Sequence, residues 1–483
     1  MNPITSLKPS IIWNYFDEIC LVPRPSKKED QMIEYLLKFA EEHQLKVKKD
    51  DVGNVLILKK GNIKESSLSP VILQSHLDMV GEKNNNIDHD FAKDPIKVKI
   101  EGDWVKAEGT TLGADNGIGI ATQLAILASD DIEHGPIECL FTVDEETGMT
   151  GAKALKKGFI TGKKLINLDS EDEGELFIGC AGGIDSVSVL DVDWESVPRN
   201  AFAFKVSVTG LTGGHSGDDI HLGRANANKV LVQFLNKFSE LIDFHISAID
   251  GGNLRNAIAR EASAICVIHT SYKEKLRVEF NILAHEIEQQ FENTDPEMLL
   301  SLQSTELTSR IIKKDLQQKL LKALEDCPHG VIEMSKTVPG LVQTSTNLAS
   351  IKILDDKITI VSSHRSSVES ERDRIALKVK KIFNKAGAKV TLSDGYPGWE
   401  PNLDSELLKK SVSLYEKLFN ETPKVRAIHA GVECGLFLTK YPDLDMISFG
   451  PTIKGAHSPD ERLHIPSVMK FWKFLIVLLH DLS

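Results

Sequence analysis

The chain has 483 residues, which is long for a single hydrophobic core and predicts two or three domains. Its apolar fraction of 41% and charged fraction of 26% are typical of an ordinary globular protein. The 57 basic and 70 acidic residues give a formal charge of −13, which argues against nucleic acid or an anionic membrane as the main partner.

The N-terminal residues and the cysteines bear on the compartment. Residues 1–20 lack the basic-then-apolar pattern of a secretory signal, and the longest apolar runs are far shorter than the ~20 residues of a membrane span. The six cysteines are scattered without a Cys-x-x-Cys pair, which disfavours a zinc ribbon or a disulfide scaffold. We therefore expect a cytoplasmic protein.

Strands alternate with helices in the first part of the chain. Apolar residues at helical spacing predict helices over 28–43 and 118–128, and runs of aliphatic residues predict strands over 71–78, 140–143 and 165–169. This alternation predicts an α/β domain, whose ligands usually collect at the carboxyl ends of its strands.

The pattern changes after a glycine-rich stretch at 179–183, which has the composition of a hinge. A series of strands followed by a helix over 284–291 indicates one sheet-and-helix module, and residues 310–393 indicate a second, related one. The last part of the chain returns to the α/β style. The predicted architecture is an α/β domain of residues 1–183 and 395–483, interrupted by an inserted α+β domain of residues 184–394.

An acidic triplet, Asp144-Glu145-Glu146, follows the strand predicted at 140–143. Successive side chains of an extended chain point to opposite sides, so Glu145 and Glu146 can serve different roles, one binding a metal and the other facing the reacting water. Adjacent carboxylates repel each other unless a cation lies beside them. The alternative is a solvated acidic turn, because most charge runs are of that kind.

Other predicted strand ends and loops carry groups that can bind metal. His76 and Asp78 face the same way in an extended segment, so Asp78 can hold the far nitrogen of a metal-binding His76. A mixed set of histidines and carboxylates suits Zn²⁺, Mn²⁺ or Co²⁺ better than Mg²⁺. Each residue alone has a structural alternative, but their joint occurrence favours a metal centre. The full set is His76, Asp78, Asp115, Glu145, Glu146, Asp169 and His457.

These residues lie in short segments that together resemble a known family. Besides the acidic triplet, the segments are His76-Leu-Asp78, Gly113-Ala-Asp115-Asn116-Gly117, Asn167-Leu-Asp169 and Ala456-His457-Ser-Pro-Asp-Glu461. In this order they resemble the co-catalytic di-zinc aminopeptidases and carboxypeptidases, and among these metallopeptidase family M20 with its bacterial cytosolic dipeptidases that cleave Xaa-His. The likeness extends over nearly the whole chain.

The resemblance implies a fold and a set of metal ligands. The fold would be a di-zinc exopeptidase-type α/β catalytic domain, with the insert as a lid and dimerisation domain. His76 and Asp169 would bind one Zn²⁺, Glu146 and His457 the other, and Asp115 would bridge both. Co²⁺ or Mn²⁺ could substitute.

The resemblance also implies a mechanism. Glu145 would be the general base that takes a proton from a metal-bridging water, which leaves the hydroxide that attacks the peptide bond, and Asp78 would orient His76. The family usually has a cis peptide bond after the bridging acid, which is here Asp115-Asn116. His215, in the segment 210–217, resembles the lid histidine that stabilises the oxyanion, from the same chain or from a partner subunit. A histidine in a glycine-rich turn is its alternative.

Three further residues resemble those that bind the free carboxylate of the substrate in this family. They are Arg365, Asn256 and the backbone of Gly435. A bidentate arginine binds a terminal carboxylate well and is left unpaired when the peptide continues, which enforces exopeptidase action. Arg255 is the competing guanidinium and ranks lower.

Other patterns are weaker. His429, Glu433 and Cys434 are interpreted as loop and core, and His464 is a rival ligand that lacks a glycine-rich loop before it. Gly117 begins an incomplete dinucleotide fingerprint, and there is no Gly-x-Ser-x-Gly elbow with a plausible triad.

The sequence therefore predicts a metal-dependent hydrolase of unblocked dipeptides, including Xaa-His, that forms a homodimer. A tripeptidase or an N-acyl amino acid deacylase of the same clan is the alternative among enzymes. A binding protein that has kept the fold and lost turnover is the alternative from another class.

Overall fold

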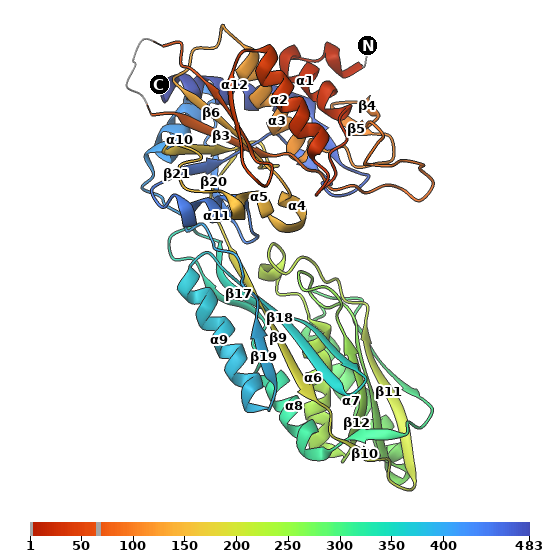
Figure 1. Cartoon of the computed structure of the whole chain (residues 1–483). Coiled ribbons are helices and arrows are strands. Elements are labelled where there is room, and N and C mark those ends of the chain that lie inside the picture. Colours follow the sequence, from red (N-terminus) through yellow and green to blue (C-terminus); the bar gives the residue numbers. More distant parts are fainter. Residues whose placement is uncertain (1–2, 64–68) are drawn as a thin grey trace. The chain divides into compact units, whose positions relative to one another are not determined.

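The computed structural model describes residues 3–63 and 69–483, which form two compact units (Figure 1). Unit 1 takes the described residues up to Gly179, together with Pro401–Ala427 and Val432–Ser483. Unit 2 takes Cys180–Glu400 and Ile428–Gly431. The predicted fold class, an α/β unit interrupted by an inserted α+β segment, is confirmed.

Unit 1 is built on an eight-stranded sheet with the order β1-β2-β6-β3-β7-β21-β8-β20. Its centre is parallel, with β3 (Val71–His76) between β6 (Ile137–Thr142) and β7 (Lys164–Asn167), and β21 (Asp445–Ser448) beside β7. Every side chain of β3 and β6 is buried, because both faces of a parallel sheet are normally covered. The carboxyl ends of these parallel strands therefore meet at one edge of the sheet.

The other elements of unit 1 extend the sheet, form a second sheet of order β22-β23-β5-β4, and provide the helices. Helix α3 packs on β3, and α2 packs on β1 and β2. None of the helices in the described ranges is long and apolar enough to cross a membrane. The strands are β1 (Lys46–Lys49), β2 (Val55–Lys59), β4 (Val98–Glu101), β5 (Trp104–Ala107), β8 (Glu175–Cys180), β20 (Lys424–Ile428), β22 (Ile453–Lys454) and β23 (Arg462–His464). The helices are α1 (Ser10–Cys20), α2 (Asp30–Glu42), α3 (Ala114–Ala128), α4 (Glu145–Gly148), α5 (Thr150–Ala154), α10 (Glu406–Phe419), α11 (Glu433–Lys440) and α12 (Ile465–Asp481).

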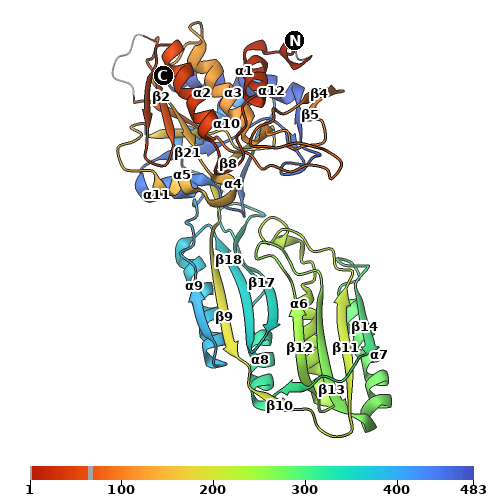
Figure 2. The same cartoon turned by 45° about the vertical axis from the view of Figure 1, so that its right-hand side comes forward.

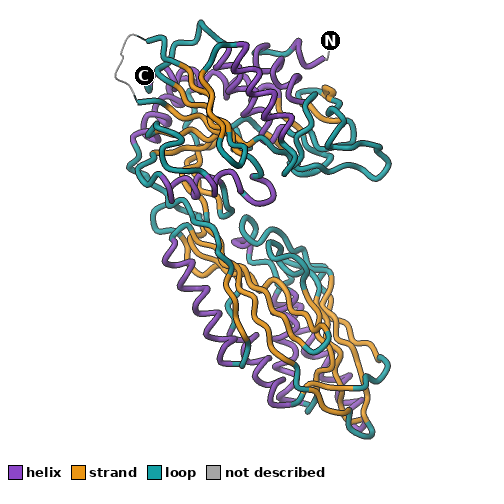
Figure 3. The backbone as a smooth tube through the Cα atoms, viewed as in Figure 1, coloured by secondary structure: helices purple, strands orange, loops and turns teal. Residues whose placement is uncertain are grey.

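Unit 2 is built on one large sheet of order β14-β11-β13-β12-β17-β18-β9-β19, with β16 paired to β17, and four helices cover it (Figures 2 and 3). Strands β12 and β17 are joined by only a short ladder, so the sheet has two halves. The strands are β9 (Gly182–Asp191), β11 (Ala201–Thr209), β12 (His245–Gly251), β13 (Ala262–His269), β14 (Leu299–Ser304), β16 (Gly330–Met334), β17 (Val342–Leu354), β18 (Lys357–Ser366) and β19 (Lys389–Leu392), and a separate pair is β10 (Trp194–Ser196) with β15 (Arg310–Ile312). The helices are α6 (Ala227–Leu241), α7 (Lys273–Gln290), α8 (Lys314–Asp326) and α9 (Glu369–Lys385).

One hydrophobic core joins the two halves of unit 2. Buried side chains of all four helices, such as Phe234, Phe280, Leu320 and Val379, pack with strand residues in one cluster. The helix predicted at 284–291 is the last part of α7, which begins at Lys273. The prediction was too short because apolar and polar residues alternate in the first half of α7, from Leu276 to Ile282, and this period is typical of a strand.

Candidate metal centre

Three neighbouring parallel strands of unit 1 bring polar groups to the same edge. His76 is the last residue of β3, Asp169 follows the end of β7, and the acidic triplet follows the end of β6. Asp115 lies at the start of α3, and His457 lies in the loop between β22 and β23. The five predicted metal ligands therefore come from five separate segments.

The two histidines of this set each face two carboxylates. His76 Nε2 lies 3.0 Å from Asp115 Oδ1 and 3.2 Å from Asp169 Oδ1. His457 Nε2 lies 3.2 Å from Asp115 Oδ2 and 2.9 Å from Glu146 Oε2. Asp115 thus offers one oxygen to each imidazole, which is the arrangement expected of a carboxylate shared by two neighbouring cations.

The residues present fit a divalent cation. Ligand atoms of His76, Asp115 and Glu146 lie within 4.8 Å of one another. Glu146 Oε1 is buried and has no hydrogen-bond partner among the described residues. A buried carboxylate oxygen without a donor is costly unless a cation binds it, and imidazole with carboxylate is a donor set suited to zinc.

The carboxylates also make the cluster attractive to positive charge. Hydrogen bonds from His457 to Asp115 and Glu146 raise the pKa of His457 to about 11. Burial alone would lower the pKa of His76, but the charge of Asp169 and the hydrogen bonds to Asp115 and Asp169 raise it well above its usual value. Burial beside other carboxylates raises the pKa of Asp169 to about 6.

Glu145 and Glu146 do not continue the strand, contrary to the prediction of an extended segment. Asp144 has a left-handed backbone with φ of 54°, and Glu145 begins the short helix α4. The hydroxyls of Thr147 and Thr150 donate to the Asp144 carboxylate, which stabilises this turn. The two glutamates are therefore separated by a helical step rather than by strand alternation.

Asp78 connects the end of β3 to the acidic helix. Its carboxylate accepts the backbone N–H groups of Glu145 and Glu146 at 2.9 and 3.2 Å, and the hydroxyl of Ser26 at 2.8 Å. Burial disfavours its ionisation, yet hydrogen bonds with His76 and with these donors lower the pKa of Asp78 to about 2. His76 Nδ1 lies 3.5 Å from the carboxylate and 3.1 Å from the carbonyl oxygen of Asp78, so the backbone is the closer partner.

The first residues of α3 help to position two predicted ligands, Asp115 and Asp169. The Asp115-Asn116 peptide bond is cis, as expected. Asn116 donates from Nδ2 to Asp169 Oδ1 at 2.7 Å, so the residue after Asp115 also orients Asp169. No role was predicted for Asn116 or Ser26 from the sequence, although Asn116 lies in the predicted segment 113–117.

Glu145 differs from an ordinary surface glutamate because its side chain is partly buried. Desolvation raises the pKa of Glu145 well above its usual value, and the charge of His76 opposes this rise while those of Asp169, Glu433 and Glu146 add to it. A carboxylate of raised pKa beside the cluster has the property required of a general base.

The predicted substrate-binding residues His215, Asn256 and Arg365 belong to unit 2, and Gly435 belongs to unit 1. His215 and Asn256 are on neighbouring segments, because His215 forms a bridge with Ala257 and the carbonyl of Asn256 accepts the N–H of Ser216 at 2.8 Å. Gly435 is in the first turn of α11, where its N–H donates to the carbonyl of Val432 at 3.3 Å.

Arg365 is nearly buried and only partly paired. Its side chain is on β18, its Nη1 donates to the hydroxyl of Tyr396 at 3.3 Å, and its Nε has no partner among the described residues. Arg255, the competing guanidinium, is exposed and already pairs with Asp185 at 3.0 Å. Arg365 is therefore the better candidate for an anionic ligand. No binding role was predicted for Tyr396 from the sequence.

The weaker candidates lie outside the cluster. His429 is in unit 2 and contacts Ser345 Oγ at 2.7 Å, and His464 packs on the ring of Trp104 at 4.9 Å. Glu433 accepts hydrogen bonds from Gln74 and Thr142 at 2.6 and 2.7 Å. The interpretation of His429 and Glu433 as structural residues agrees with these contacts.

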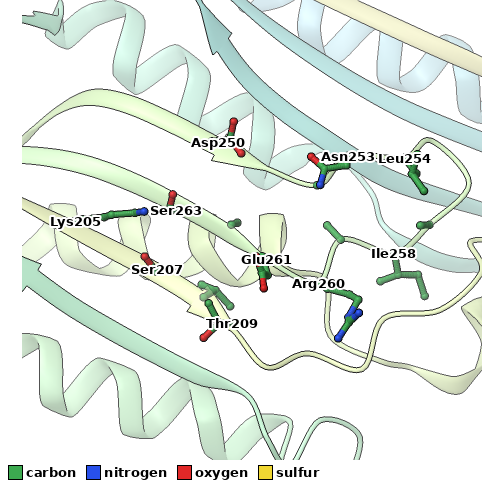
Figure 4. A pocket seen from close by; sticks show the side chains of 15 residues that line it. Lys205, Ser207, Thr209, Asp250, Asn253, Leu254, Ile258, Arg260, Glu261 and Ser263 are labelled. Carbon is green, nitrogen blue, oxygen red and sulfur yellow. The ribbon is translucent and has the colours of Figure 1, made fainter. Parts of the chain in front are cut away.

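A pocket of about 530 Å³ lies on the sheet of unit 2 (Figure 4). Lys205, Ser207 and Ser263 line it and alternate along their strands with core residues, so this pocket is on the face opposite the helices. Its lining contains none of the predicted metal ligands or substrate-binding residues. Its lining residues contain no cluster of histidines and carboxylates like that of unit 1.

Comparisons with known proteins agree with this geometry. Residues 72–481 match the model of "Peptidase family M20/M25/M40". The cytosol non-specific dipeptidase of Escherichia coli (strain K12) is 42% identical over 482 residues, which is 100% of this chain and 99% of that protein. The crystal structure of aminoacylhistidine dipeptidase from Vibrio alginolyticus superposes with a TM-score of 0.93 at 41% identity and covers 99% of this chain and 98% of that chain.

A more distant structure shows the fold alone. Aminopeptidase PepT from Bacillus cereus has a TM-score of 0.58 at 15% identity, with 99% of each chain covered. The family match spans far more than half of the sequence, and the two near relatives are aligned over almost their full lengths. This chain belongs to peptidase family M20/M25/M40.

Proposed function

We propose that this protein is a dipeptidase that hydrolyses the peptide bond of unblocked dipeptides, including Xaa-His, with two bound Zn²⁺ ions. The observation that carries the proposal is Asp115, whose two carboxylate oxygens face two different imidazoles, His76 and His457. The full-length similarity to two proteins named as dipeptidases supports the substrate class.

Five side chains would hold the two ions. His76 and Asp169 would bind one, Glu146 and His457 the other, and Asp115 both. Divalent ions in such a site lower the pKa of water and polarise a carbonyl, which is the chemistry that peptide hydrolysis needs. Co²⁺ or Mn²⁺ could take the place of Zn²⁺, because both accept the same mixed ligands.

Glu145 would move the protons of the reaction. Its backbone N–H is held by Asp78 at 2.9 Å, which fixes the first turn of α4 beside the ligands. Its raised pKa lets the carboxylate take a proton from the attacking water and release it to the leaving amine. Asp78 would act with it by orienting His76.

Three residues of unit 2, together with Gly435 of unit 1, would bind the substrate. His215 Nδ1 lies 3.1 Å from the backbone nitrogen and 3.0 Å from the carboxylate of Asp218, and Nε2 would be the donor for a developing oxyanion. Arg365 has an unpaired Nε and would bind the free carboxylate, with Asn256 and the backbone of Gly435 as further partners.

The domain roles and the assembly follow from the same proposal. Residues 1–183 and 395–483 would be the catalytic domain, and residues 184–394 the lid and dimerisation domain of a homodimer. A cytoplasmic location is supported by the name of the relative from Escherichia coli, a cytosol dipeptidase.

The test is a substrate panel combined with metal analysis of the purified protein. Dipeptides, including Xaa-His, should be cleaved, whereas tripeptides and N-acyl amino acids should not. A chelator should abolish activity, and Zn²⁺, Co²⁺ or Mn²⁺ should restore it. Cleavage of tripeptides or acylated amino acids alone would select another reaction of the clan, and metal binding without any turnover would indicate a binding protein.

A further inference from the structure

Glu461 is a buried carboxylate that accepts four backbone hydrogen bonds from one segment. Its side chain is 2% exposed. Oε2 accepts the N–H groups of Leu112 and Gly113 at 2.7 and 2.9 Å, and Oε1 accepts those of Ala114 and Asp115 at 2.8 and 3.2 Å. All four donors belong to the turn that leads into α3 and places Asp115.

Glu461 also stands close to a second predicted ligand. It follows His457 by four residues in the loop between β22 and β23, where Glu461 N–H donates to the carbonyl of Ser458 at 3.0 Å. One side chain therefore connects the loop that carries His457 to the turn that carries Asp115. These are the two residues whose nitrogen and oxygen lie 3.2 Å apart in the cluster.

Arg24 also binds the turn before Asp115 and joins it to another segment of the cluster. It is 2% exposed, and its Nη1 donates to the carbonyls of Leu77 and Asp78, both at 3.0 Å. Its Nη2 donates to the carbonyl of Gly113 at 2.5 Å. Arg24 thus joins the turn before Asp115 to the segment that follows His76, and its charge lies near that of Glu461.

We propose that Glu461 is a positioning residue that sets the separation of Asp115 and His457, so that both can bind the same metal ion. The inference rests on the proposed two-metal function. Charge-assisted hydrogen bonds from four N–H groups hold the turn more firmly than neutral contacts would. Replacing the carboxylate by an amide puts an NH₂ group against donors, which leaves buried N–H groups without an acceptor.

Glu138 provides a matched control in the same unit. It is also 2% exposed, and its carboxylate accepts the N–H groups of Thr161 and Gly162 at 2.8 and 3.0 Å. It is near the start of β6, at the end of the strand opposite to the ligands. Glu138→Gln therefore disturbs a buried carboxylate of similar kind without touching the segments of the metal centre.

The experiment compares Glu461→Gln and Glu138→Gln with the natural protein. Zn²⁺ affinity and stoichiometry are measured by competition with a chromophoric chelator, and circular dichroism checks the fold of the metal-free proteins. Glu461→Gln should bind at least one ion ~10–100-fold more weakly, the size expected when a group that orients a metal ligand is removed. Glu138→Gln should keep the natural affinity even if its thermal stability falls.

The outcomes separate this inference from the proposed function. Unchanged affinity in Glu461→Gln, with two ions bound by the natural protein, would overturn the positioning role alone. Equal weakening in both variants would also overturn it, because the effect would then be general destabilisation. A natural protein that binds no ion would overturn both proposals. If Glu461→Gln does not fold, Glu461→Asp decides: its shorter carboxylate should weaken binding, and natural affinity would refute the role.

Discussion

Two histidines of unit 1, His76 and His457, and one of unit 2, His364, occupy opposite environments. In unit 1, His76 and His457 each face two carboxylates, and in both the pKa is raised. In unit 2, His364 is buried between the hydroxyls of Ser186 and Thr346, and desolvation lowers its pKa to about 4. The carboxylates thus favour the positive charge of His76 and His457, whereas His364 stays neutral.

The difference indicates what each unit can bind. The unit 1 cluster has an excess of carboxylate and suits cations. Near Arg365 in unit 2, burial first and then the charge of Arg365 lower the pKa of His429 to about 3, so this histidine is neutral. The Arg365 guanidinium, with its unpaired Nε, suits an anion such as a substrate carboxylate. Four predictions test this division.

The largest effect is expected at Glu145, which lies outside the proposed ligand set of the unit 1 cluster. Glu145→Gln should lower kcat ~10²–10⁴-fold, the usual contribution of a general base, with the metal content unchanged. Its neighbour is the control: Glu146→Gln should lose metal, because Glu146 Oε2 is 2.9 Å from His457 Nε2. Metal analysis together with kinetics on one dipeptide distinguishes the two. Metal loss in Glu145→Gln would mean that Glu145 is a metal ligand and not the general base.

Arg365 tests the anion-binding side of the comparison. Arg365→Ala should raise KM for free dipeptides ~10–100-fold with a smaller change in kcat, as a hydrogen-bonded charge is lost. The same variant should have little effect on dipeptide amides, which lack the carboxylate. Arg255→Ala is the control, because Arg255 is exposed and pairs with Asp185. An equal rise in KM for amides and free dipeptides would rule out carboxylate recognition.

Part of this division could be predicted from the sequence. Residues at the ends of predicted parallel strands, such as His76 and Asp169, were placed together because strand ends share an edge. The predicted extended conformation of Glu145 and Glu146 was wrong. The turn at Asp144 depends on side-chain hydrogen bonds, which the apolar periodicity of the sequence does not indicate. Glu461 and Asp115 are 346 residues apart, and a contact of that separation has no local pattern.

The neutral state of His364 in unit 2 can be tested through the pH dependence of protein stability. The unfolded chain takes up a proton below a pKa of ~6.5, whereas folded His364 does so only near 4, so its contribution to stability is present above pH 6.5 and is lost as the pH falls toward 4. Relative to His364→Gln, the natural protein should lose on the order of 2 kcal/mol between pH 7.5 and 5. Hydrogen exchange of β17 and β18 amides measures this, and a difference independent of pH would contradict it.

The smallest effect concerns how Arg365 is held. Tyr396→Phe removes the hydroxyl that accepts from Arg365 Nη1 at 3.3 Å but keeps the ring, which packs against Gly183 and Gly431. Losing one such hydrogen bond should raise KM for free dipeptides ~2–10-fold, less than Arg365→Ala, with kcat nearly unchanged. If Tyr396 acts through Arg365, adding Tyr396→Phe to Arg365→Ala should change KM no further. A full additional rise in the double variant would instead mean that Tyr396 contacts the substrate directly.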